Sequence, residues 1–154
     1  LRIAVEGCAH GALDTIYGTL QHVCAIDGEH VDALLCCGDF QAVRNESDLE
    51  TMACPMKYRS MQSFFKYYRG DAVAPVLTLF IGGNHEASSF LEELPFGGWV
   101  APGVYFLGRA GSVLLDGVRV SGWSGIYQRE HFDRGHDERW PLERGDMRSV
   151  YHTR

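Results

Sequence analysis

Two continuous apolar runs, each closed by a glycine turn, constrain the fold of this chain more than any other feature. Residues 33–37 run into Gly38, and residues 76–81 run into Gly82 and Gly83. Such runs are typical of strands buried on both faces, as in a parallel sheet covered by helices. A third apolar run, residues 2–5, precedes a segment whose apolar residues recur at helical spacing: Leu13, Ile16, Tyr17, Leu20 and Val23. This order of strands and helix predicts an α/β fold.

The second half of the chain has a different pattern. Short strands are predicted at residues 104–107, 112–115 and 118–121, the last two joined by the hairpin dipeptide Asp116–Gly117. From Trp123 onward the sequence has no sustained period, and six Arg are interspersed with six Asp and Glu. We therefore expect a β meander followed by a long polar loop.

Composition limits the classes of protein that this chain can be. Its 154 residues fill one domain, and a net charge of −6 gives the whole chain no general attraction for nucleic acid. No apolar stretch approaches the roughly 18 residues of a membrane span. The five cysteines are odd in number and come without a signal peptide, which predicts an intracellular, reducing compartment. Because the chain opens with Leu1 and closes at Arg154 outside any expected element, we expect a fragment.

Potential metal ligands follow each of the three apolar runs. Cys8 and His10 follow the first run, Asp39 follows the second, and residues 84–86 (Asn, His, Glu) follow the third. The carboxyl ends of parallel strands open onto one edge of a sheet, so these clusters are expected to converge there. Cys8 and His10 are two residues apart and point the same way. Thiolate, imidazole, carboxylate and amide together favour a first-row transition metal over calcium or magnesium.

Each ligand also has an ordinary structural interpretation. Cys8 alone is compatible with a small core residue, and Asp39 alone with the N-cap of a following helix. A turn needs Gly83 and Asn84 but has no use for a consecutive His and Glu. Taken together, the three clusters favour a metal site over three coincidental turns.

The three clusters resemble the calcineurin-like metallophosphoesterase superfamily, a β-sandwich flanked by helices with a two-metal site. Within it, the chain resembles the RNA lariat debranching family, in which Cys8 stands where most superfamily members carry Asp. The resemblance runs from Leu1 to Arg154 and rests on these segments: residues 7–11 (GCAHG), 36–45 (CCGDFQAVRN), 82–88 (GGNHEAS), 95–102 (PFGGWVAP), 124–127 (SGIY) and 148–152 (RSVYH).

The resemblance implies a ligand set and a catalytic residue. Cys8, His10 and Asp39 would bind one divalent metal, Asp39 and Asn84 the second, and His85 would be catalytic. The implied cofactors are two divalent transition-metal ions, which would be iron, zinc or manganese. Residues 1–154 would be the N-terminal portion of the catalytic domain, incomplete at its C-terminus, because the family supplies three further histidine ligands downstream.

The implied substrate is branched RNA, and the implied reaction is hydrolysis of the 2'-5' bond of an excised intron lariat, in the nucleus. Residues 123–154 would be the lariat recognition loop, with residues 136–138 (His, Asp, Glu) on a solvated face. A helix over residues 55–69 would align Arg59, Gln62, Lys66 and Arg69 along phosphates or simply expose them to solvent. The other candidate substrate contacts are Arg44, Asn45, Glu86, Tyr127, Tyr151 and His152, although the aromatic residues would equally pin the loop to the body.

Two other functions remain open at this point. The chain could act on a different phosphate ester, or it could be a short product that binds branched RNA without cutting it. Neither an obligate protein partner nor a membrane is implied.

Overall fold

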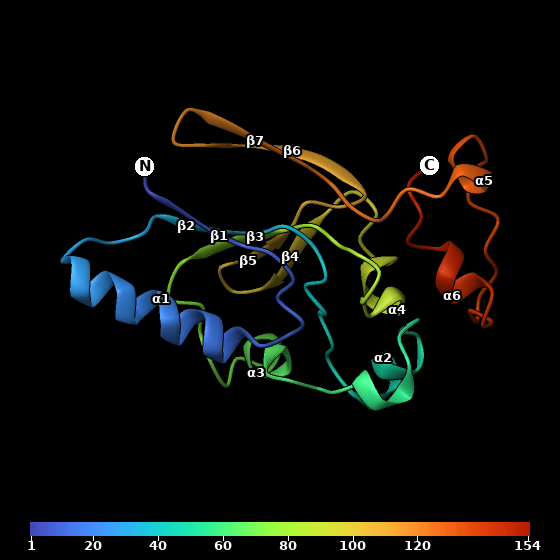
Figure 1. Ribbon diagram of the computed structural model, residues 1–154, viewed down its shortest axis with the longest axis horizontal. Coiled ribbons are helices and arrows are strands. Elements are labelled where there is room, and N and C mark those ends of the chain that lie inside the picture. Colours follow the sequence, from blue (N-terminus) through green and yellow to red (C-terminus); the bar gives the residue numbers. More distant parts are fainter.

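A five-stranded mixed sheet forms the centre of the protein. The computed structural model describes all 154 residues, and Figure 1 shows the sheet between a layer of helices and a separate hairpin. The strand order is β1-β2-β3-β5-β4, with β4 antiparallel to β5 and the other pairs parallel. The strands are β1 (Ile3–Glu6), β2 (Ala33–Cys36), β3 (Leu77–Phe80), β4 (Gly98–Ala101) and β5 (Val104–Phe106). The α/β class and the parallel pairing of the three apolar runs are confirmed.

Helices cover one face of this sheet and enclose the core. The longest is α1 (Leu13–Asp27), and the Tyr17 hydroxyl on it lies 2.8 Å from the Thr78 hydroxyl on β3. Phe40 and Phe80 stack with ring centroids 3.8 Å apart. Large apolar side chains thus fill the space between helices and sheet. The other helices before β4 are short: α2 (Glu46–Glu50), the 3-10 turn η1 (Met56–Tyr58), α3 (Phe64–Arg69) and α4 (Ser88–Leu91).

The hairpin of β6 (Ala110–Leu115) and β7 (Val118–Trp123) lies over the opposite face of the sheet (Figure 1). Its turn is the predicted Asp116–Gly117, where both residues have positive φ. A methyl group at Gly122 would come within 2.4 Å of the Ile81 side chain, so β7 packs directly on the end of β3. The second layer is consistent with the expected sandwich, here with two strands.

Two predictions about local structure were wrong. Residues 104–106 do not pair with the hairpin but join the main sheet beside β3, because their side chains are apolar enough to be buried on both faces. Residues 55–69 do not form one helix, since the chain turns at Gln62, which has φ 48°, before α3 begins. The basic stripe expected along that helix therefore does not exist.

Residues 123–154 form a mostly irregular segment, as predicted, with two short helices, α5 (Arg129–Phe132) and α6 (Asp146–Ser149). The segment returns to the main sheet, because the Gly125 N–H donates to the Gly82 carbonyl over 2.9 Å. Residues 136–138 were predicted to lie on a solvated face, and this prediction is wrong for Glu138. Its side chain is 5% exposed and pairs with Arg154 and His136.

The cysteines and the helices add two further facts. All five cysteines are unpaired. No helix combines the length and the apolar character that a membrane crossing requires.

Candidate metal centre and catalytic site

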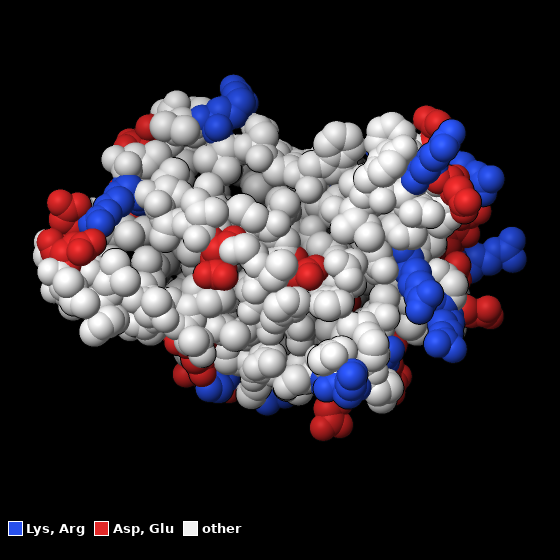
Figure 2. Space-filling view, in the orientation of Figure 1, with Lys and Arg blue, Asp and Glu red and all other residues white.

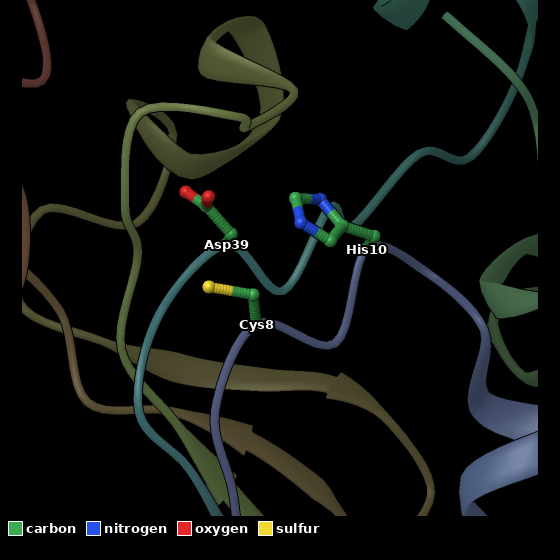
Figure 3. A group of neighbouring side chains, drawn as sticks. All are labelled: Cys8, His10 and Asp39. Atoms are coloured by element: carbon green, nitrogen blue, oxygen red, sulfur yellow. The ribbon is translucent and has the colours of Figure 1, made fainter. Parts of the chain in front are cut away.

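Cys8, His10 and Asp39 come together just beyond the carboxyl ends of β1 and β2. One ligand atom from each lies within 4.8 Å of the other two. Figure 3 shows the three side chains facing a common space, two from the loop after β1 and one from the loop after β2. The convergence follows from the parallel register, which pairs Glu6 with Cys36 and so ends both strands side by side.

The backbone of the two loops is locked together under the cluster. The His10 N–H donates to the Asp39 carbonyl over 2.7 Å, and the Gly11 N–H donates to the Phe40 carbonyl over 2.9 Å. His10 and Asp39 both have φ of 45°, in the left-handed region that costs L residues energy. Strained conformations of this kind persist only where surrounding contacts fix them, and they gather at functional sites.

The geometry excludes the ordinary structural interpretations of Cys8 and Asp39. Cys8 is exposed, so it is not a core residue. The first helix after Asp39 is α2, whose N-cap is Asn45. Asp39 therefore caps no helix, and its carboxylate is left for other partners.

The loop after β3 brings Asn84 and His85 to the same place. The His85 N–H donates to Asp39 Oδ1 over 2.9 Å, and His85 Nδ1 lies 3.7 Å from Asp39 Oδ2. The His85 and His10 rings are 5.2 Å apart between centroids. Asn84 is partly exposed and lies between His85 and Gly83, both of which approach Asp39 closely. The structure thus gathers Cys8, His10 and His85 around Asp39, and Asn84 belongs to the same loop as His85.

Glu86 has a structural position that its sequence context did not reveal. Its side chain is buried, Oε1 accepts from the N–H groups of Phe40 and Gly83, and Oε2 accepts from Gln41 N–H. Both oxygens thus brace the loops after β2 and β3, and this arrangement does not support the predicted contact of Glu86 with substrate. Burial raises the pKa of this carboxyl to about 7, against the three N–H donors that favour its ionised form.

Arg44 and Asn45 also have structural partners. The Arg44 guanidinium donates twice to the buried Asp48 carboxylate, contacts Glu93, and lies over the Phe90 ring. Asn45 Oδ1 accepts from Asp48 N–H as the N-cap of α2. Because both side chains are occupied by local partners, the structure does not support a substrate contact for either residue.

The three remaining predicted substrate contacts lie in residues 123–154. Tyr127 is 64% exposed. Tyr151 is partly buried, and burial raises the pKa of its phenol against the opposing charge of Arg148. His152 Nδ1 lies 2.8 Å from His131 Nδ1, and burial together with this neighbour lowers the pKa of His152. Tyr151 and His152 line the same cavity as Gly83 and Glu86 of the loop after β3.

Charged side chains are unevenly spread over the molecule. On the face seen in Figure 2, the central part carries small acidic patches and no Lys or Arg, and charged residues of both signs lie at the two ends, most densely where α5 and α6 lie. Two of the residues assigned to the former basic stripe have partners of their own, because Arg59 donates to the Cys54 carbonyl and Lys66 pairs with Asp14. Any attraction for a polyanion therefore depends on local residues, not on a continuous basic surface.

The donors present fit a divalent transition metal. A thiol, an imidazole and a carboxylate within one small space are the ligands that zinc and ferrous iron prefer, and the Asp39 carboxylate has a side-chain exposure of only 13%. One hydrogen bond, from the His85 N–H, fixes Asp39 Oδ1 and leaves Oδ2 facing the His85 ring. Fixed ligands of this kind reduce the cost of forming a metal site.

Comparison with known proteins identifies relatives along the whole chain. Residues 1–150 match the calcineurin-like phosphoesterase family. All 154 residues align at 58% identity with lariat debranching enzyme A of Xenopus laevis and with the lariat debranching enzymes of Drosophila melanogaster and Homo sapiens. The aligned part covers 29%, 29% and 28% of those proteins, so the chain spans less than a third of their length.

Proposed function

The chain belongs to the calcineurin-like phosphoesterase family, and from this membership we propose that it is a metal-dependent phosphodiesterase acting on the 2'-5' branch-point bond of lariat RNA. The observation that carries the proposal is the cluster of Cys8, His10 and Asp39 beside His85. Lariat debranching enzymes are the relatives that align with it over its full length. The proposed location is the nucleus, where excised introns are formed.

Two divalent metals are assigned to this cluster. Cys8, His10 and Asp39 hold one ion, and Asp39 and Asn84 hold the other. When bound, such ions polarise a phosphate ester and lower the pKa of water toward about 7. The chain contributes the placement of the ligands, because Glu86 and the backbone pairing of the two loops fix Asp39 and His10 in strained conformations.

His85 is proposed to donate a proton to the departing ribose oxygen. Its backbone N–H and its ring both face Asp39, so the ring is held at the edge of the cluster and remains 32% exposed to a bound substrate. The carboxylate 3.7 Å from Nδ1 orients the imidazole and leaves Nε2 as the atom that would carry the donated proton. Residues 123–154 would flank the branch, and the exposed Tyr127 ring would stack on a base.

The test is cleavage of a synthetic 2'-5' branched RNA against a linear 3'-5' control by the intact protein loaded with Mn²⁺, Zn²⁺ or Fe²⁺. We expect cleavage of the branch only, and His85→Ala to lower its rate by about 10² to 10⁴ while metal content holds. His22→Ala on the exposed side of α1 is the matched control and should leave the rate unchanged. Cleavage of both RNAs, or of small esters alone, would indicate another phosphoesterase activity. Tight binding of branched RNA without cleavage would indicate a binding protein.

The thiolate of Cys8 makes a transition metal the proposed cofactor. Cys8→Asp should lower the affinity for Zn²⁺ and Fe²⁺ and leave Mn²⁺ affinity less affected, because carboxylate is a harder ligand than thiolate. Inductively coupled plasma mass spectrometry after dialysis against mixed metals measures the change. The matched control is Cys37→Asp, because Cys37 is also exposed but lies outside the proposed ligand set. An unchanged ratio of bound metals in Cys8→Asp would argue that Cys8 is not a ligand.

A further inference from the structure

A groove of about 420 Å³ lies between the segment that follows α2 and the residues around the start of α6. One side is formed by residues 50 and 52–56 together with Arg59, and the other by Arg144, Met147 and Arg148. No proposed metal ligand and no residue of the loop after β3 lines it. The groove is therefore distinct from the metal centre.

Three of the four methionines in the chain line this groove: Met52, Met56 and Met147. Met52 is buried, whereas Met56 is 74% exposed, so the apolar surface continues from the interior into solvent. Methionine side chains are unbranched and polarisable, and they adapt their shape to different apolar partners. The methionines thus form an apolar surface that a side chain of another molecule could cover.

The groove also carries positive charge that the chain does not neutralise. Arg144 and Arg148 are exposed and form no ion pair. Arg59 donates to the backbone carbonyls of Cys54 and Glu50, which are uncharged acceptors. Glu50 is the only acidic residue in the lining, although the whole chain has a net charge of −6. Three arginines against one glutamate therefore make the groove locally basic.

Two acidic residues lie close to these arginines in the sequence but do not line the groove. Asp146 Oδ2 accepts from the Glu143 N–H over 3.4 Å at the first turn of α6. Neither carboxylate forms an ion pair with an arginine. The local excess of positive charge is thus left for an external anion.

An acidic protein segment fits this combination better than a nucleic acid. No aromatic side chain lines the groove, whereas single-stranded RNA is held largely by bases stacked on aromatic rings. Methionine and arginine are both enriched in protein interfaces, and guanidinium groups pair with carboxylates through two parallel hydrogen bonds. We propose that this groove docks an acidic segment of a partner protein. Carboxylates of the segment pair with Arg144 and Arg148, and an apolar side chain packs between Met56 and Met147.

The first test measures fluorescence anisotropy of a labelled peptide on the intact protein. The peptide contains Glu and Ala with two leucines one helical turn apart, and the matched probes replace Glu by Lys or Leu by Ser. A chelator is present throughout, so the result is independent of the metal centre and of the proposed hydrolysis. We expect the acidic leucine peptide to bind at least about tenfold more tightly than either matched probe. Equal affinity for this peptide and either probe, or no binding at millimolar concentration, would overturn the proposal.

Competition distinguishes a protein segment from RNA. The competitor is an oligouridylate with the same number of negative charges as the acidic peptide. We expect it to displace the labelled peptide only at concentrations at least about tenfold above those of the unlabelled peptide, because it offers charge without an apolar side chain. Displacement at a similar or lower concentration would assign the groove to RNA and overturn the proposal.

The second test uses variants at exposed positions. Arg148→Glu should weaken peptide binding at least about tenfold, and Met56→Ser about fivefold, because the first reverses a charge and the second removes apolar contact. Arg119→Glu, on the hairpin and outside the groove, should bind like the parent. If both groove variants keep the parent's circular dichroism spectrum and affinity, the proposal is wrong.

Methionine methyl resonances provide a readout in the parent protein itself, which holds even if a variant unfolds. The acidic peptide must shift the ε-methyl resonances of Met56 and Met147. Met61 is the internal control, because it is the one methionine outside the groove. Unmoved resonances of Met56 and Met147 at saturating peptide would contradict docking in the groove.

Discussion

Gly83 shows how the site depends on a single missing side chain. A methyl group there would lie 2.1 Å from Asp39 Oδ1 and 2.7 Å from Asp39 N. Real Cβ atoms do not approach that closely, so any other residue at position 83 would push Asp39 away from His10 and Cys8. The glycine is required by the distance between two loops, not by its own backbone conformation.

Gly83→Ala should therefore reduce metal binding and lower the free energy of unfolding by about 1 to 3 kcal/mol. Gly135→Ala is the control, because nothing lies within 4 Å of a methyl group there. Metal content by mass spectrometry and thermal unfolding measure the two effects. Full metal content in Gly83→Ala would contradict the placement of Asp39 in the site.

Asp48 holds the Arg44 side chain in a buried ion pair. Burial alone would raise the pKa of its carboxyl, but hydrogen bonds from the Arg44 side chain and backbone outweigh burial and lower the pKa below its ordinary 3.8. A carboxyl with a lowered folded-state pKa stabilises the protein above its unfolded-state pKa. That contribution is lost as the pH falls below about 3.8 through the lower, folded-state value.

Asp48→Asn should lower the free energy of unfolding by about 3 kcal/mol at pH 7, because Arg44 then loses its buried partner. The difference from the parent should narrow as the pH falls below 3.8, where the parent carboxyl also becomes neutral. Urea unfolding between pH 7 and pH 3 measures this difference in the free energy of unfolding. Glu46→Gln, at an exposed position on the same helix, is the control. A difference in the free energy of unfolding that stays constant across this pH range would show that the charge of Asp48 does not stabilise the protein.

At the scale of elements, α1 connects the metal-ligand loop to the core. It begins three residues after His10 and ends where Gly28 adopts φ 69°, a left-handed C-cap. Gly18 lies in its exposed middle. A methyl group added at either glycine would meet open space, so only the backbone conformations of the two positions distinguish them.

Gly18→Ala should raise the free energy of unfolding by about 0.5 to 1 kcal/mol, since alanine restricts the unfolded chain and favours helix. Gly28→Ala should lower it by about 1 to 2 kcal/mol, because an L side chain is strained in the left-handed region. The two variants are each other's control, and chemical denaturation measures both. Changes in the free energy of unfolding that have the same sign in both variants would contradict the assigned end of α1.

At the scale of the whole molecule, the metal centre joins three loops that follow three strands. An ion bound there would hold the ends of β1, β2 and β3 together and would bind only the folded state. Such binding stabilises by about 2.7 kcal/mol when the free ion is at 100 times its Kd.

Chelation should accordingly lower Tm by about 5 to 10 °C in a protein of this size. Differential scanning calorimetry with and without a chelator measures the shift. Cys8→Ala should reduce the shift, while Cys24→Ala, on α1 and outside the donor cluster, should preserve it. Equal Tm with and without chelator in the parent would contradict a metal that bridges the loops.

The amino-acid sequence alone determined the parallel strands, the helix after the first of them, and the convergence of Cys8, His10, Asp39 and His85. These follow from local apolar runs and from the rule that parallel strands open onto one edge. Only the tertiary structure decided that Glu86 braces two loops, that Arg44 is held by Asp48, and that three of the four methionines line one groove. Those partners are brought together by the packing of whole elements, and a hydrogen bond between particular side chains leaves no periodic signal in the sequence.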